Sequence, residues 1–162
     1  MGRPRSISDD VILDAVLSLL MAGGEGAVSF GTVSKACGLA PPTLVQRYGD
    51  RQGMLRAALN RGWARLSEVA EVAAGQEENA QGFLKRLGDE PLLPLVVASL
   101  ADAEATARAA AWRADVERVL MAKLGCRPEA AAMLFAAWQG RMLWEAAGGG
   151  GFKLKDAARR LG

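Results

Sequence analysis

The amino-acid sequence predicts an all-α protein, and three observations support that prediction. Alternating runs of β-branched residues are nearly absent, and Ala, Leu, Glu and Arg dominate the chain. Apolar residues recur at three- and four-residue spacing. Capping residues, glycines and prolines separate these periodic segments. With 162 residues, 51% of them hydrophobic, the chain is long enough for one core or for a small domain fused to a larger one.

Composition narrows the possible functions. The 20 basic and 18 acidic residues leave a net charge of +2, so any basic surface must be local. Histidine is absent, which removes the commonest general base and metal ligand. Two cysteines, Cys37 and Cys126, are too few for a disulfide framework or a zinc site. We therefore expect no enzyme, no metal and no cofactor.

The start of the chain lacks the pattern of an export signal. Asp9, Asp10 and Asp14 interrupt the apolar stretch that a signal peptide requires. The longest apolar runs are also too short for a membrane-spanning helix. The expected location is the cytoplasm.

Three helices are expected at the N-terminus, over residues 8–23, 29–38 and 41–48. Ser8 and Ser29 are suitable caps for the first two, and glycines end them. The third begins with Pro41 and Pro42, which a first helical turn tolerates because its amides have no helical partner. The double proline therefore predicts a helix start.

The remaining helices follow from the same signals. A long amphipathic helix is expected from Arg51 for about six turns. Polar and proline-containing breaks then separate further helices at 80–87, 94–101, 102–124 and 128–147. A tetraglycine precedes a last helix in "FKLKDAARRL".

The first three helices have the arrangement of a helix-turn-helix, with Gly38 in the turn between the second and third. In that motif the third helix enters the major groove of DNA and the second braces it. We expect four residues to face the core: Ala36, Leu39, Leu44 and Tyr48. The outward side of the third helix is then formed by Pro41, Pro42, Thr43, Gln46 and Arg47.

These outward side chains suit the chemistry of DNA. Thr43 can bond a phosphate or touch a thymine methyl, Gln46 can pair with adenine, and Arg47 can fork onto guanine or a phosphate. Lys35 and Arg51, at flanking helix ends, are expected to hold phosphates. The alternative interpretation is that Gln46 and Arg47 form only a solvated helix face.

The stretch "GLAPPTLVQRYGDRQGML", residues 38–55, resembles the TetR family of repressors without gaps. The upstream "VILDAVLSLLMAGGEGAVSFGTVSKACG" resembles the first two helices of that family, so the likeness covers the first 55–60 residues. It implies a transcriptional regulator whose N-terminal helices bind an operator and whose C-terminal helices bind an inducer and dimerise. By position, Thr43, Gln46, Arg47 and Tyr48 fall in the recognition helix, and Arg51 is the basic residue opening the fourth.

Two positions depart from the family pattern. Ala40 stands where a capping Ser is common, and the proline pair partly offsets the missing cap. Val45 stands where a Tyr commonly holds the DNA backbone, and a valine side chain cannot make that phosphate contact. The "PTLVQR" segment is thus similar to a variant branch of the family. The leader "GRPR" resembles a minor-groove arm carrying Arg3 and Arg5; the alternative is a disordered basic tail.

The C-terminal part holds all four tryptophans and balanced charge, with 13 basic and 13 acidic residues after residue 61. Its aromatic and methionine residues are candidates for an apolar ligand cavity, or are simply core. The candidate ligand residues are Trp63, Phe83, Trp112, Met121, Phe135 and Trp138.

The helix from Pro128 and the last helix resemble the dimer-forming pair of the family. The residues expected in this dimer interface are Leu134, Trp138, Met142, Leu154, Ala158 and Leu161. A two-fold homodimer would place two recognition helices on a palindrome.

Together these features predict a helix-turn-helix DNA-binding domain at 1–55, joined by a long helix to a helical ligand-binding and dimerisation domain at 56–162. The expected function is a repressor that binds a palindromic operator in double-stranded DNA and is released by a small hydrophobic ligand. The alternative is a helical protein-interaction module that has kept the fold and lost DNA binding.

Overall fold

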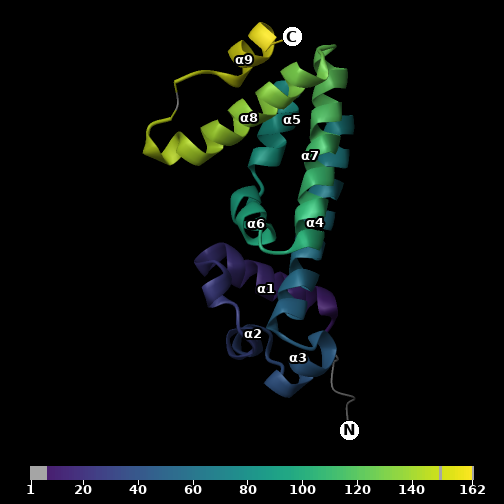
Figure 1. The fold of residues 1–162 in the computed structure, drawn as a ribbon, viewed down its shortest axis with the longest axis vertical. Helices are drawn as coiled ribbons and strands as arrows, with labels where there is room; N and C mark the ends of the chain where they lie inside the picture. The colour runs from purple at the N-terminus through teal and green to yellow at the C-terminus, as the bar shows by residue number, and fades with distance from the viewer. Residues whose placement is uncertain (1–6, 150, 162) are drawn as a thin grey trace. The chain divides into compact units, whose positions relative to one another are not determined.

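All regular secondary structure among the described residues, 7–149 and 151–161 of a computed structural model, is helical (Figure 1). The all-α prediction is confirmed. Within these residues, no helix combines the length and apolar character needed to cross a membrane.

The chain packs into two compact units. The first contains the described residues up to Ala64 together with Pro94–Arg108, and the second contains Arg65–Leu93 and the chain from Ala109 onward. The long helix α4 (Arg51–Gln76) and helix α7 (Ala103–Leu124) contribute residues to both units. These packing units divide the chain differently from the functional division expected at residue 55, which stays a prediction.

The first unit begins with α1 (Asp9–Gly23), a short 3-10 turn η1 (Glu25–Ala27), α2 (Phe30–Cys37) and α3 (Pro41–Tyr48) (Figure 1). A capping box starts α2, since Ser29 accepts from the Thr32 amide and the Thr32 hydroxyl accepts from the Ser29 amide. Gly38 ends α2 in the left-handed region, at φ 76°, where a residue with a Cβ is strained. The turn between α2 and α3 therefore depends on this glycine.

Helix α3 starts without a side-chain cap, as Ala40 at the cap position predicted. Ala40 is extended, at φ −65° and ψ 140°, which the following proline favours. Pro41 and Pro42 have no amide hydrogen, and the Thr43 amide bonds to the Ala40 carbonyl at 3.0 Å. No amide of this first turn is left that needs a cap.

Buried apolar residues hold the first unit together. Leu44 anchors α3 and is fully buried, as are Val16 of α1 and Val33 of α2. Trp63 of α4 donates its indole N–H to the Ser99 hydroxyl at 2.9 Å, and Ser99 ends α6 (Leu92–Ser99). The core thus fixes α3 by its inward side and leaves the other side to solvent.

The second unit contains the rest of α4 and α7 with α5 (Ala80–Gly88), α8 (Pro128–Trp144), η2 (Glu145–Ala147) and α9 (Leu154–Leu161) (Figure 1). Here α7 runs in the same direction as α4: Trp112 donates to the Leu66 carbonyl, and Lys123 donates to the Ala74 carbonyl. The Lys123 ammonium also lies 5.9 Å from the centre of the Phe83 ring, which joins α7 to α5.

The later helix boundaries differ slightly from the expected ones. Helix α6 begins at Leu92 rather than residue 94, because a proline fits inside a first helical turn. Helix α8 ends at Trp144 and continues as the short η2. The last helix begins at Leu154, two residues later than expected.

Candidate nucleic-acid interface

One side of α3 is open to solvent and forms the candidate DNA-binding surface. Its exposed residues are Pro41, Pro42, Val45, Gln46 and Arg47. Thr43 is half-buried beside them. Four of the five residues expected on the outward side are therefore exposed, Thr43 is the exception, and Val45, 43% exposed, is open as well.

The expected inward-facing residues divide into two groups. Leu44 is fully buried, and Leu39 and Tyr48 are half-buried. The expectation for Ala36 was wrong, since Ala36 is exposed at the end of α2. The physical reason is that α2 is short and buries only Val33 completely, so its last turn extends beyond the core.

The guanidinium of Arg47 is held by the start of α1. Its Nη1 donates to the Ile7 carbonyl at 2.8 Å and to Asp9 Oδ1 at 3.1 Å. Its Nε and Nη2 have no bond to any other described residue, and 29% of the side chain is exposed. The Nη1 end of the guanidinium is thus held by α1, and the edge formed by Nε and Nη2 is available for another partner.

Tyr48 shares the same carboxylate. Its hydroxyl donates to Asp9 Oδ1 at 3.0 Å. Burial and this hydrogen bond raise the pKa of the Tyr48 hydroxyl to about 12. Asp9 thereby ties the last turn of α3 to the first turn of α1, and the neutral phenol is the form that fits.

The first turn of α4 lies close against the end of α3. A Cβ at Gly53 would collide with the Tyr48 carbonyl oxygen, so glycine is required for this approach. Asp50 accepts from the Gly53 amide at 2.7 Å and so caps α4.

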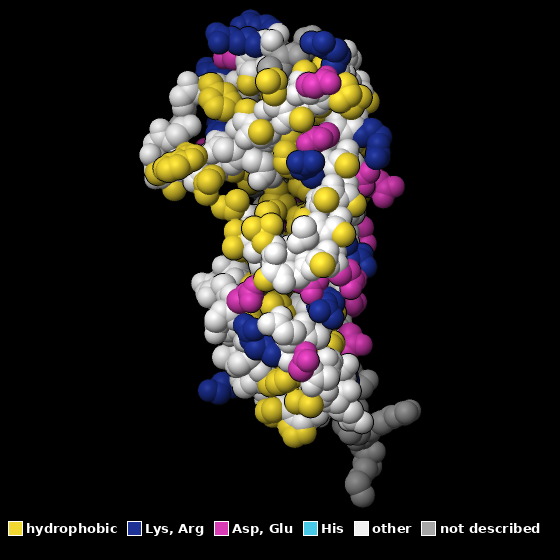
Figure 2. Space-filling model, viewed as in Figure 1, with side chains coloured by type: hydrophobic (Ala, Val, Ile, Leu, Met, Phe, Trp, Pro, Cys, Tyr) yellow, Lys and Arg dark blue, Asp and Glu magenta, His cyan; other side chains and the backbone are white. Residues whose placement is uncertain are grey.

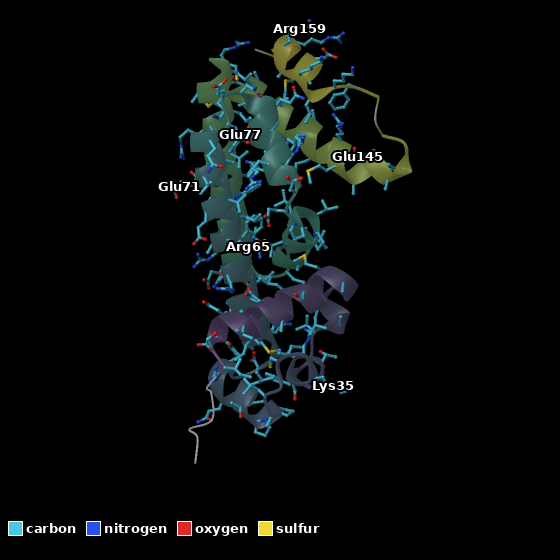
Figure 3. The ribbon with its side chains drawn as sticks, turned by 180° about the vertical axis from the view of Figure 1, so that it is seen from behind. Lys35, Arg65, Glu71, Glu77, Glu145 and Arg159 are labelled. Atoms are coloured by element: carbon cyan, nitrogen blue, oxygen red, sulfur yellow. The ribbon has the colours of Figure 1, made fainter. Side chains whose placement is uncertain are left out.

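The two expected phosphate-binding residues have different environments. Lys35 is exposed on the last turn of α2 (Figure 3). Arg51 is half-buried, donates to the Val28 carbonyl at 2.7 Å and also bonds to the Glu25 carbonyl. Its guanidinium therefore joins α4 to the connection between α1 and α2. Arg3 and Arg5 lie outside the described residues.

The sequence interpretation missed the role of the acidic residues in α1. Asp9 bonds Arg47 and Tyr48, and Arg61 of α4 bonds Asp10 and Asp14 at 2.7 and 2.6 Å. From sequence alone, acidic residues in the first turn of a helix are explained by their favourable interaction with the helix dipole. Only the fold shows that their partners lie 38 to 51 positions further along the chain.

The structure separates the expected ligand residues. Trp63 is buried in the first unit and bonded to Ser99, so its place in a ligand pocket stays a prediction. In the second unit Phe135 lies between Trp112 and Trp138, with ring centres 6.2 and 5.6 Å apart. Phe83 is fully buried near Lys123, and Met121 is half-buried.

Two cavities of the second unit contain residues from this group. Trp112 borders a space of about 390 Å³ between α4 and α7, together with Ala70, Glu71 and Val119. Trp138 borders one of about 330 Å³ formed by α5, α8, η2 and α9. The aromatic residues thus contribute to two separate spaces rather than to one.

The expected dimer residues are also divided. Leu134 and Trp138 are buried inside the second unit, so their assignment to a surface for a second chain is revised. Met142, Leu154 and Ala158 are half-buried, and the side chain of Leu161 lies outside the described residues.

The apolar surface of α8 lies elsewhere. Met133, Leu143 and Trp144 are 60, 52 and 60% exposed, and Ala136 is exposed between them. Their spacing places them on one side of the helix. Figure 2 shows hydrophobic side chains over the end of α8 that contains Leu143 and Trp144.

No protein-family model matches the chain. Over 79 residues, 49% of the chain, it is 30% identical to the HTH-type transcriptional repressor ComR of Escherichia coli K12. Over 102 residues, 59% of the chain, it is 29% identical to the HTH-type transcriptional regulator AlkX of Mycobacterium tuberculosis H37Rv. The matches span 38 and 48% of these relatives, so the chain covers less than half of each.

Solved structures resemble nearly the whole chain. A TetR-like transcriptional regulator from Rhodococcus sp. RHA1 superimposes with a TM-score of 0.68 at 18% identity, covering 99% of this chain and 94% of that one. The TetR family transcriptional regulator PfmR from Thermus thermophilus gives 0.59 at 20% identity, covering 92 and 93%. The chain therefore has the fold of TetR-like transcriptional regulators.

Proposed function

We propose that the protein is a sequence-specific DNA-binding transcriptional regulator that uses α3 as its recognition helix. The observation that carries the proposal is the open side of α3, where Gln46 and Arg47 are exposed while Leu44 anchors the helix in the core. The fold of the chain and the names of its two relatives support this function.

Arg47 would read DNA with the free edge of its guanidinium. Because Nη1 is bonded to Ile7 and Asp9, the guanidinium is held in place while its Nε and Nη2 atoms have no partner among the described residues. A pre-oriented fork loses less entropy on binding guanine or a phosphate. Thr43 and Gln46 would supply further contacts from the same side of α3.

Binding would depend little on general electrostatic attraction. Arg51 is used inside the unit, and the proline pair leaves no free amide at the start of α3 for a phosphate. Lys35 and the two arginines of the leader, Arg3 and Arg5, are the remaining candidates for backbone contacts.

The regulator would act as a homodimer on a palindromic operator. The exposed side of α8, formed by Met133, Ala136, Leu143 and Trp144, supports association with a second copy. Large exposed apolar side chains on one side of a helix are favourable to bury, and a two-fold pair presents the same surface twice. Repression, with release by a small ligand bound in the second unit, completes the proposal.

Selection from random DNA tests the proposed function. We expect the purified chain to enrich an inverted repeat, and Arg47→Ala to weaken binding to the selected site by about tenfold or more. Arg86→Ala, which removes the same charge from the exposed surface of α5, is the matched control and should change affinity little. The salt dependence should be shallow, corresponding to about two to four phosphate contacts for each chain.

A protein-interaction module of the same fold is the second candidate. Val45 favours it, because this apolar side chain of the α3 surface is 43% exposed. If selection enriches no sequence, or if Arg47→Ala and added salt leave affinity unchanged, the DNA-binding proposal fails and this candidate takes its place.

A further inference from the structure

We infer that the cavity beside Trp138 binds a small zwitterion, an amino acid with an apolar side chain. The cavity has a volume of about 330 Å³ and is formed by α5, α8, η2 and α9. Ligand cavities in proteins begin at roughly this size, so the ligand must be small. The inference rests on the proposed function in one respect: the amino acid would be the small ligand of the proposed regulator.

The indole N–H of Trp138 is the first observation. The buried tryptophans Trp63 and Trp112 donate to Ser99 and to the Leu66 carbonyl. Trp138 as a residue is equally buried, at 2% exposed, but its N–H donates to no described residue and, unlike Asn60 Oδ1, it is not shut off from solvent. An acceptor supplied by a ligand in the cavity would therefore replace water at this donor.

This N–H belongs to the cavity lining rather than to closed core. Gly88, at the end of α5, lies opposite: a Cβ there would be 3.7 Å from Trp138 Nε1 and 3.9 Å from Met142 Sδ. Gly88, Trp138 and Met142 all line the cavity. The missing side chain of Gly88 therefore leaves space in front of the donor.

Charged side chains of both signs are the second observation. Lys85 and Asp89 reach the cavity from α5 and its C-terminal end, and Arg141 and Glu145 reach it from α8 and η2 (Figure 3 labels Glu145). Each pair is spaced for an i,i+4 ion pair, yet neither pair forms one in the described structure. Among the described residues, the only side-chain hydrogen bond of this group is a long one, 3.5 Å, from Arg141 to the Phe152 carbonyl. Two cations and two carboxylates thus remain available.

The lining matches the groups of an amino acid. A ligand carboxylate would accept from the Trp138 N–H and pair with Lys85 or Arg141. A ligand ammonium would pair with Asp89 or Glu145. Leu84 is buried in the cavity wall, and an apolar ligand side chain would lie against it. This polar lining changes the expectation of a wholly apolar ligand.

Nuclear magnetic resonance of the indole N–H groups tests the inference directly. The full chain, labelled with nitrogen-15, gives one indole signal for each of its four tryptophans, and Trp138→Phe identifies the signal of Trp138. L-Leucine, L-methionine and L-phenylalanine are the probes. We expect at least one of them to shift the Trp138 signal saturably while the Trp63 signal stays in place.

Single-charge analogues and variants supply the controls. The N-acetyl and amide derivatives of the bound amino acid should bind about tenfold more weakly or worse, because each lacks one charge. Arg141→Gln and Glu145→Gln should weaken binding similarly. Arg86→Gln and Glu129→Gln, exposed residues of α5 and α8 outside the cavity lining, should not. Circular dichroism confirms that each variant is folded.

Two results would overturn the inference: none of the three amino acids shifts the Trp138 signal, or both derivatives bind as well as the parent. DNA binding, measured on the same preparation without amino acid, separates this outcome from failure of the proposed function. Amino-acid binding without DNA binding would support the cavity assignment and contradict the proposed function as a DNA-binding regulator.

Discussion

In the first unit, arginines of α3 and α4 bond residues far away in the sequence, whereas in the second unit ion pairs mostly join neighbours. Arg47, Arg51, Arg56 and Arg61 each bond to a residue at least 23 positions distant. Three of the four ion pairs in the described part of the second unit span three or four positions, and Arg65–Glu90 is the exception.

This difference shows where each unit uses its charge. The first unit uses positive charge to join its helices, which fixes the direction of α3 and leaves few cations for DNA. The second unit leaves the charges around the Trp138 cavity without ion-pair partners among the described residues. Arginine side chains thus join helices in the first unit, whereas the charged side chains around the Trp138 cavity remain unpaired among the described residues.

The largest expected effect tests the packing that fixes α3. Leu44→Ala should lower the free energy of unfolding by about 3 kcal/mol, because Leu44 is fully buried and the substitution leaves a cavity. The neighbouring Val45→Ala should stay within about 0.5 kcal/mol, since Val45 is 43% exposed. Chemical denaturation measures both, and equal losses would mean that α3 is not anchored through one side.

The next prediction concerns the exposed side of α8. Met133→Glu should raise the dissociation constant of the homodimer by about 100-fold, because the interface would then bury a charge. Val72→Glu is the control, an exposed apolar residue of α4 in the same unit. Analytical ultracentrifugation gives the oligomeric state. A dimer insensitive to Met133→Glu would assign self-association to another surface.

A smaller effect tests the bond between α1 and α3. Asp9→Asn should weaken DNA binding by about five- to tenfold, since Arg47 would lose its fixed direction. If Asp9 acted only through its negative charge, its removal would strengthen DNA binding. Weaker binding therefore indicates that Asp9 positions Arg47. Asp10→Asn makes the same charge change on a residue that bonds Arg61 instead. If both variants bind DNA more tightly, Asp9 does not position Arg47.

The smallest effect appears only at high pH. Tyr48 is the only tyrosine of the chain, so ultraviolet absorbance of ionised phenol reports it alone. Because its pKa is raised from 10.0 to about 12, the stability it contributes is fully present below pH 10 and is lost as the pH rises toward 12. Asp9→Asn should lower the titration midpoint, although burial keeps it above 10.0. An unchanged midpoint would mean that the phenol does not depend on Asp9.

Several elements could be predicted from the sequence because their causes are local. The caps at Ser8 and Ser29, the glycine after α2 and the proline pair of α3 act on neighbouring backbone groups. The open side of α3 followed from spacing, because a helix with one buried anchor must expose its opposite side. Ala36 was misplaced because spacing alone does not show where the core ends.

Only the tertiary structure determined which polar side chains already have hydrogen-bond partners within the protein. The sequence identified Arg47 and Arg51 as basic residues near a recognition helix, but a side chain's hydrogen-bond partners depend on residues brought close by folding. Arg51 bonds two carbonyls of the connection between α1 and α2, while Arg47 keeps one edge free. Trp138 is a second example. Residue type and spacing predict that it is buried, but they do not predict that its indole N–H borders a cavity and has no acceptor among the described residues.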